Sequence, residues 1–211
     1  MPITSYRTVA HDGFAEIEEG RSRFRCTLAR VTDAEGARAV VDQVNKQHWD
    51  ARHHCTAMIV GPDRGYESSS DSGEPPGTGG GPMLEELRGR ELSDLVAVGS
   101  RWFGGEFLGS GQLAAGYATA TRAALDEVGT VERVLQDLCE VEIDIAAVGR
   151  LEHDLRSRGA RVLGVDYTGE ALLRFAIPPL ARSVAEDIVD DLTSGTGRLR
   201  VIGQRWVDAG G

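Results

Sequence analysis

The chain passes from an apolar run into a glycine-rich segment at Leu95-Val-Ala-Val-Gly-Ser-Arg-Trp-Phe-Gly-Gly-Glu-Phe-Leu-Gly-Ser-Gly111. The apolar run at its start, residues 95–98, predicts a buried strand. After Gly111 the apolar residues recur at spacings of three and four, which predicts a long amphipathic helix; they are Leu113, Tyr117, Ala120, Ala124 and Val128. The glycines are therefore expected between a strand and the start of a helix, where free amides and the helix dipole favour an anion.

Another glycine-rich segment lies earlier in the chain, at Asp71-Ser-Gly-Glu-Pro-Pro-Gly-Thr-Gly-Gly-Gly-Pro82. In chain order, we call residues 71–82 the first glycine segment and residues 100–111 the second glycine segment. Glycine loses more backbone entropy on folding than other residues do. Dense glycine is therefore retained where φ is positive or where another group approaches the backbone closely. We expect the two segments to form the functional surface of the protein.

The remaining sequence of the first half predicts the strands and helices around these segments. Expected strands cover residues 6–9, 14–17, 24–31 and 54–60, and a short helix is expected over 83–88. The first two strands form a predicted hairpin that turns at His11-Asp-Gly13. Another helix is expected to begin at Thr32, because Thr32 and Glu35 have the spacing of a capping box.

The last third of the chain predicts the element order βαββαβ within roughly 70 residues, the ferredoxin-like arrangement in which two helices cover one face of an antiparallel sheet. We place the domains at residues 1–132 and 133–211. Glu140, Glu142 and Asp144 alternate with apolar residues, which predicts a strand with one solvated, acidic face. Such a face is poorly suited to RNA.

Composition narrows the functional class. The chain has 211 residues, of which 41% are hydrophobic, so it can bury a sizeable core. Three cysteines without a C-x-x-C pair indicate neither a disulfide framework nor a zinc site, and no apolar run approaches the roughly 20 residues of a membrane span. We expect a cytoplasmic protein without a membrane partner. The formal charge of −10 argues against a general nucleic-acid coat protein, so any nucleic-acid contact must be local.

The second glycine segment contains the candidate binding residues. Arg101 and Trp102 offer a guanidinium and an aromatic ring beside open backbone, which suits a phosphate and a stacked base; the expected backbone contacts are Gly104, Gly105, Gly109 and Gly111. The alternative is that Trp102 and Phe103 fill the core at the end of a strand. The segment lacks the spacing of a dinucleotide fingerprint and of a P-loop.

The first glycine segment contains Asp71, Glu74 and Thr78 as candidates. Two acids at this spacing could hold Mg²⁺ or act as an acid and base pair. The alternative is that they cap nearby amides and turns, as acids in loops often do.

The run His53-His54-Cys55 does not predict a metal site. The two histidines face opposite sides of a strand, and Cys55 shares a face with His53 alone. We expect no metal and no cofactor.

Three motifs of this chain resemble those of the YigZ/IMPACT family. They are D-x-G-E-P-x-G-T at Asp71–Thr78, T-R-Y-F-G-G-x-x-L-G-x-G at Ser100–Gly111 and H-H-C at His53–Cys55, with S-R-F at Ser22–Phe24 in addition. The resemblance implies an α+β protein. Its N-terminal domain would be a two-layer α/β sandwich similar to domain 2 of ribosomal protein S five. Its C-terminal ferredoxin-like domain would be similar to the last domain of elongation factor G.

The resemblance also implies partners. Both similar proteins act on RNA or ribosomes, and the eukaryotic IMPACT branch is associated with regulating translation by binding a protein activator of an initiation-factor kinase. This chain departs from the family pattern at Phe107 and Ala115, where a lysine and an arginine are usual. Two positive charges that could contact phosphate are therefore missing.

These observations lead to three hypotheses. The first is a non-enzymatic binding protein that acts on RNA, the ribosome or a translation-related protein through the two glycine segments. The second is an enzyme or small-ligand protein that holds a phosphorylated metabolite at residues 104–111. The third is a protein-docking module without a small ligand.

Overall fold

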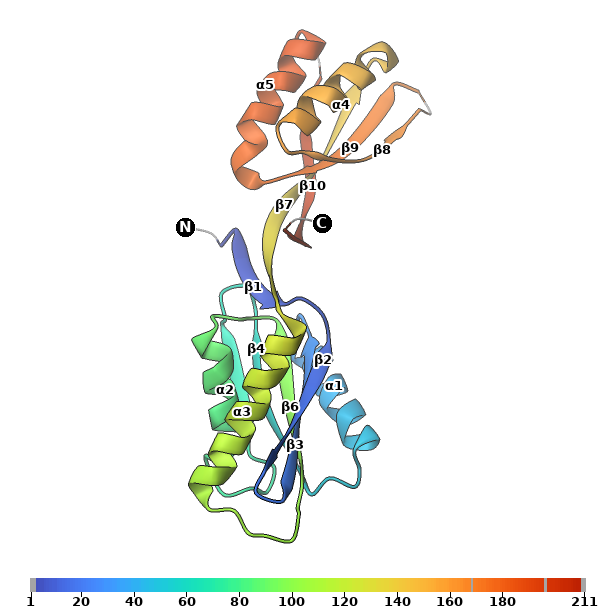
Figure 1. The fold of residues 1–211 in the computed structure, drawn as a ribbon. Helices are drawn as coiled ribbons and strands as arrows, with labels where there is room; N and C mark the ends of the chain where they lie inside the picture. The colour runs from blue at the N-terminus through green and yellow to red at the C-terminus, as the bar shows by residue number, and fades with distance from the viewer. Residues whose placement is uncertain (1–2, 168, 196, 210–211) are drawn as a thin grey trace. The chain divides into compact units, whose positions relative to one another are not determined.

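The computed structural model describes residues 3–167, 169–195 and 197–209 (Figure 1). The chain divides into two compact units, of which one is Ser5–Glu132 and the other holds the rest of the chain. Both units combine helices with antiparallel sheets, so the predicted α+β class is confirmed. In the described part of the chain, no helix is both long and apolar enough to cross a membrane.

The N-terminal unit is built on an antiparallel sheet with the strand order β2-β3-β6-β4-β5. Its strands are β2 (Gly13–Glu19), β3 (Ser22–Arg30), β4 (His53–Val60), β5 (Tyr66–Ser70) and β6 (Leu95–Trp102). Strand β6 is central, and its Arg101 lies opposite Phe24 of β3 and His53 of β4. The strand therefore continues through Arg101 and Trp102, which had been expected in the glycine-rich loop.

Helices cover both faces of this sheet (Figure 1). Helices α2 (Gly80–Gly89) and α3 (Ser110–Val128) bury one face, with Phe24, Leu28, Ile59 and Leu95 in the core between them and the sheet. Helix α1 (Ala34–Gln47) packs on the other face, against Val96, Val98 and Met58. The unit thus has three layers where two were expected, because β4 and β6 are apolar on both faces and each face requires a cover.

Two local predictions are wrong. Strand β2 forms its hairpin with β3, through a turn at Gly20 and Arg21, and not with β1 (Ser5–Val9). Gly20 adopts a φ of +58°, which a tight turn of this kind favours and glycine tolerates. The helix cap is also one residue later than predicted, because the carboxylate of Asp33 accepts a hydrogen bond from the amide of Gly36.

The second unit has the ferredoxin-like order. Its elements are β7 (Thr130–Ile143), a short 3-10 turn (Ile145–Ala147), α4 (Val148–Ser157), β8 (Arg161–Asp166), β9 (Ala171–Ile177), a second 3-10 turn (Pro179–Ala181), α5 (Arg182–Thr193) and β10 (Arg200–Asp208). The strands follow the order β10-β7-β9-β8 and pair antiparallel. Leu151 of α4 and Val189 of α5 are buried in one core with Val141 and Phe175 of the sheet.

The strand face predicted to be acidic at β7 carries less uncompensated negative charge than expected. Glu140 lies opposite Arg174 of β9 and Arg200 of β10, and its carboxylate forms an ion pair with each. Asp144 has left the strand and caps the next turn, where it accepts a hydrogen bond from the amide of Ala146. Arginines on the two neighbouring strands therefore neutralise the carboxylate of Glu140, which has no such partner along its own strand.

Candidate functional site

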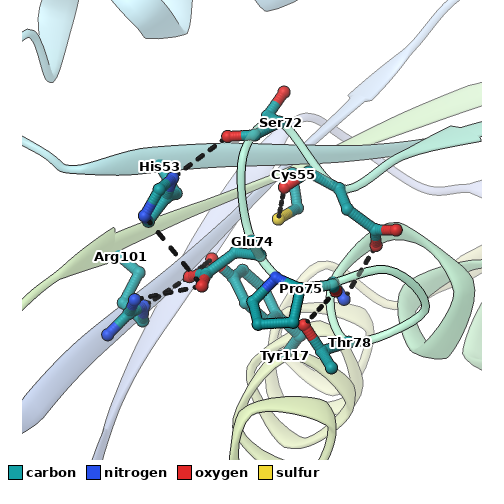
Figure 2. A network of polar contacts seen from close by, with 10 residues as sticks. His53, Cys55, Ser72, Glu74, Pro75, Thr78, Arg101 and Tyr117 are labelled. Carbon is teal, nitrogen blue, oxygen red and sulfur yellow. Dashed lines mark hydrogen bonds and ion pairs between the residues drawn. The ribbon is translucent and has the colours of Figure 1, made fainter. Parts of the chain in front are cut away.

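Arg101 and Glu74 form a buried ion pair at one end of the N-terminal sheet (Figure 2). Arg101 projects from β6 toward α3, and Glu74 projects from the loop between β5 and α2. The guanidinium donates from Nε to Glu74 Oε1 at 2.5 Å and from Nη2 to Oε2 at 3.1 Å. Each residue is only 6% exposed. The structure therefore places Arg101, predicted to bind phosphate, inside the protein with its charge already compensated.

Tyr117 and His53 complete this group, which we call the Glu74 cluster. Tyr117 Oη donates to Glu74 Oε1 at 2.9 Å, and His53 Nε2 lies 4.0 Å from Glu74 Oε2 (Figure 2). His53 is held in place by its Nδ1, 3.0 Å from the carbonyl oxygen of Ser72. Burial, together with the nearby Cys55 and Glu74, raises the pKa of Tyr117 well above its ordinary value, so the hydroxyl remains a donor. The cluster attaches the first glycine segment to the sheet.

Asp71 caps the start of α2 from within the same loop. Its carboxylate accepts hydrogen bonds from the amides of Gly77, Gly79 and Gly80 at 2.8, 3.0 and 2.9 Å. Burial raises the pKa of Asp71, but the three amide bonds outweigh burial, and the net pKa lies below the ordinary value. Thr78 donates from its hydroxyl to the carbonyl of Pro75 at 2.7 Å. The amides that could have held an anion are thus occupied by the protein's own carboxylate.

The first glycine segment also lies unusually close to β4. A Cβ at Gly79 would fall 2.2 Å from Cys55 Sγ, and the Cys55 thiol donates to the carbonyl of Asp71 at 3.0 Å. Burial raises the pKa of Cys55 to about 12, so the thiol stays protonated. Across the described residues, no group of three or more histidine, cysteine or acidic side chains could hold a metal ion. The Glu74 cluster and the Asp71 cap therefore have the character of structural contacts.

Trp102 lies on the opposite face of the sheet from Arg101. Successive residues of a strand point to opposite faces, and β6 continues through both. The guanidinium of Arg23 lies 4.0 Å from the centroid of the Trp102 ring, and His48 at the end of α1 contacts the ring edge-on at 5.4 Å. Arg101 and Trp102 consequently cannot contact one ligand side by side, as their adjacency in the sequence had suggested.

The second glycine segment forms an exposed loop between β6 and α3. A Cβ at Gly104 would fall 1.6 Å from the carbonyl oxygen of Arg21, so the loop passes directly against the β2–β3 turn. Gly105 adopts a φ of +86°. Gly109 and Gly111 are exposed at the start of α3, where the amide of Gly109 donates to Gln112 Oε1 at 3.1 Å.

Aromatic and basic side chains lie on this loop and on the turn that precedes β4. Phe107 is 90% exposed and contacts Phe103 with the ring centroids 5.2 Å apart. Arg52 lies 5.7 Å from the Phe103 ring, and its amide donates to the carbonyl of Arg101 at 2.9 Å. Trp49, in the same turn as Arg52, is 82% exposed. We call this group the aromatic surface; it comprises Arg21, Arg23, Trp49, Arg52, Trp102, Phe103 and Phe107.

Sequence reasoning identified only part of this surface. Trp49 and Arg52 belong to the turn between α1 and β4, far in sequence from both glycine segments. Their one local signal is an aromatic and a basic residue placed between a predicted helix and a predicted strand. The role of Tyr117 was also hidden, because its spacing makes it one more member of the apolar stripe of α3.

The chain is similar to proteins of one family along nearly its whole length. The Impact N-terminal domain family matches residues 20–125. The chain is 33% identical to IMPACT family member YvyE of Bacillus subtilis (strain 168) over 94% of this chain and 91% of that protein. It is 36% identical to IMPACT family member YigZ of Escherichia coli (strain K12) over 79% of this chain and 81% of that protein.

A solved structure described as that of a hypothetical protein is also similar. It aligns with a TM-score of 0.67 and 31% identity, over 96% of this chain and 99% of that one. The agreement covers both units of the fold, and the sequence matches include the glycine segments that build the site. The protein therefore belongs to the IMPACT family.

Proposed function

We propose that this protein binds single-stranded nucleic acid through the aromatic surface, as a non-enzymatic regulator linked to translation. The observation that supports this proposal is the position of exposed aromatic rings beside guanidinium groups. Trp49 and Phe107 are almost fully exposed, and Arg52 lies against Phe103. Single strands are bound in this way, by stacking bases on aromatic rings while nearby cations contact the backbone.

The cations available for phosphate are Arg21 and Arg52. Both are exposed, and neither forms an ion pair with any residue that the structure describes. Arg101 is compensated by Glu74, and Arg122 by Glu86 at 2.6 Å. Binding by two free guanidiniums agrees with the net charge of −10, because affinity would come from stacking more than from phosphate neutralisation.

The family supports a link to translation. The family resemblance implies domains similar to a ribosomal protein and to an elongation factor, which favours RNA as the nucleic acid. The eukaryotic IMPACT branch is associated with translational control. The aromatic surface lies in the part of the chain that the Impact N-terminal domain matches.

The test is binding of a short, labelled single-stranded RNA of mixed sequence, measured by fluorescence anisotropy at about 50 mM salt. Trp49→Ala and Phe107→Ala should each weaken binding by about fivefold or more, because a stacked base contributes about 1–3 kcal/mol. Tyr66→Ala is the matched control, since Tyr66 is an exposed aromatic residue outside this surface. Absence of binding, or equal weakening in all three variants, would refute the proposal.

A small phosphorylated ligand at residues 104–111 is the second candidate. The observation in its favour is that α3 begins without a side chain that caps its first-turn amides, beside the open space at Gly111. A thermal-shift screen of nucleotides and phosphorylated metabolites with Mg²⁺ tests it. A ligand at 100 times its Kd should stabilise the protein by about 2.7 kcal/mol, and a screen without any shift eliminates this candidate.

A further inference from the structure

A groove runs between α1 and the β2–β3 hairpin, on the sheet face opposite the Glu74 cluster. Its cavity measures about 410 Å³, within the range of small-molecule sites. Val40 and Val44 of α1 form one wall, and Arg25 and Thr27 of β3 lie on the other side with Phe14 of β2. The groove exists because α1 packs over β4 and β6 and leaves the outer half of the sheet uncovered.

Two buried polar atoms of the groove residues have no hydrogen-bond partner among the described residues. They are Arg25 Nε and Thr27 Oγ1. A buried donor or acceptor that stays unsatisfied costs about 1–3 kcal/mol. On the same face of the sheet, Trp102 Nε1 is also buried without a partner. A ligand with donors and acceptors along its edge would satisfy such atoms, whereas a purely apolar side chain would not.

The groove also contains a flat platform. The guanidinium of Arg25 lies 3.3 Å from the centroid of the Phe14 ring, and Phe14 remains 48% exposed. The guanidinium of Arg23 lies over the Trp102 ring in the same way. The carboxylate of Glu16 lies 3.8 Å from Arg23 and 2.9 Å from Arg25, so it bridges the two arginines. Planar rings stack on aromatic residues and on guanidinium planes alike.

The platform connects the groove to the aromatic surface. Trp102 lies opposite Arg23, and Thr27 follows four residues later on the same face of β3. At about 3.4 Å per residue of strand, Thr27 lies about 14 Å along β3 from the position opposite Trp102. A strand of nucleic acid held at Trp102 could therefore extend into the groove without any change in the fold.

We propose that the groove holds one unstacked base of the bound single strand, with the base edge on Thr27 and its ring against the Phe14 and Arg25 platform. This inference rests on the function proposed above. The amide side chains of Gln43 and Gln47 also line the groove, and they can donate to and accept from a base. A base fits better than a phosphate, because Arg25 is already paired with Glu16.

The experiment is a thermodynamic cycle between Thr27 and the bases of the RNA. Thr27→Val removes the hydroxyl with little change of shape, and the oligonucleotide is made abasic at one position at a time. In intact RNA, Thr27→Val should weaken binding about threefold to tenfold, as expected for one hydrogen bond. With the base removed at one position, wild type and Thr27→Val should bind equally.

Folding and binding are separated by two controls. Because the Thr27 hydroxyl has no partner in the described chain, Thr27→Val should unfold at the same urea concentration as wild type or at a higher one. Thr119→Val, at an exposed position of α3, should bind as wild type does. Equal binding of intact RNA by wild type and Thr27→Val would overturn the inference. So would a cycle in which, at every position of the RNA, the loss from Thr27→Val and the loss from base removal are additive.

The outcomes also distinguish the inference from the proposed function. If Trp49→Ala and Phe107→Ala weaken binding while Thr27→Val does not, the aromatic surface binds the strand and the groove holds no base. If wild type binds no RNA, both the function and the base site are refuted.

Discussion

The Arg101 guanidinium and the Glu74 carboxylate, 27 residues apart in the chain, form two hydrogen bonds to each other inside the N-terminal unit. The pair joins the central strand to the first glycine segment, and Tyr117 donates to the same carboxylate. Two of the motif residues that resemble a binding site are therefore partners of each other. Both residues hold the first glycine segment against the sheet.

Arg101→Ala should lower the free energy of unfolding by about 3–5 kcal/mol, because it leaves Glu74 buried without its cation. The measurement is urea denaturation followed by fluorescence. In the double variant Arg101→Met with Glu74→Leu, the charge and its partner are removed together, so the loss should be smaller. An Arg101→Ala variant as stable as wild type would contradict the buried ion pair.

Asp71→Asn should destabilise the protein by about 1 kcal/mol at pH 7, because the neutral amide caps α2 less well than the carboxylate. The pKa of Asp71 is lowered in the folded state, so its ionised form contributes stability above the ordinary carboxyl value of about 3.9. That contribution is lost as the pH falls through the lowered pKa. The difference in the free energy of unfolding between the two proteins, measured by urea denaturation, should be smaller near pH 3 than at pH 7, and a constant difference would contradict the cap.

Gly104→Ala should displace the second glycine segment, because its Cβ would overlap the carbonyl of Arg21. We expect a loss of more than about 1 kcal/mol of stability and weaker RNA binding. Gly111→Ala is the matched control, since a Cβ there meets nothing within 4 Å. That variant should be as stable as wild type or more stable. Equal stability of the two variants would contradict the close contact between Gly104 and the β2–β3 turn.

RNA binding should depend only weakly on salt. Contacts from Arg21 and Arg52 to two phosphates predict a slope of log K against log salt of about −1.4, at about 0.7 per phosphate of a single strand. Arg52→Ala should reduce the slope by about half, whereas Arg158→Ala in the second unit should leave it unchanged. Anisotropy titrations over a series of salt concentrations give the slope. A value steeper than about −4 would require a larger basic site than this surface offers.

Much of the fold could be predicted because burial leaves a periodic trace in the sequence. The apolar run at Leu95 marks β6, and the spacing from Leu113 to Val128 marks α3. The ferredoxin-like order of the second unit follows from the same kind of signal. Strand pairing was harder to predict, as β2 shows, since a turn signal at His11-Asp-Gly13 cannot say which strands it joins.

The candidate site was predictable in its motifs but not in its contacts. The sequence by itself determined that the second glycine segment lies between a buried strand and a helix, and the motifs of both segments indicated the family. Only the tertiary structure decided that Arg101 faces Glu74 while Trp102 faces Arg23 on the other side of the sheet. Local sequence records periodicity and conformational preference, whereas the partner of a side chain depends on which distant segments the sheet register brings together.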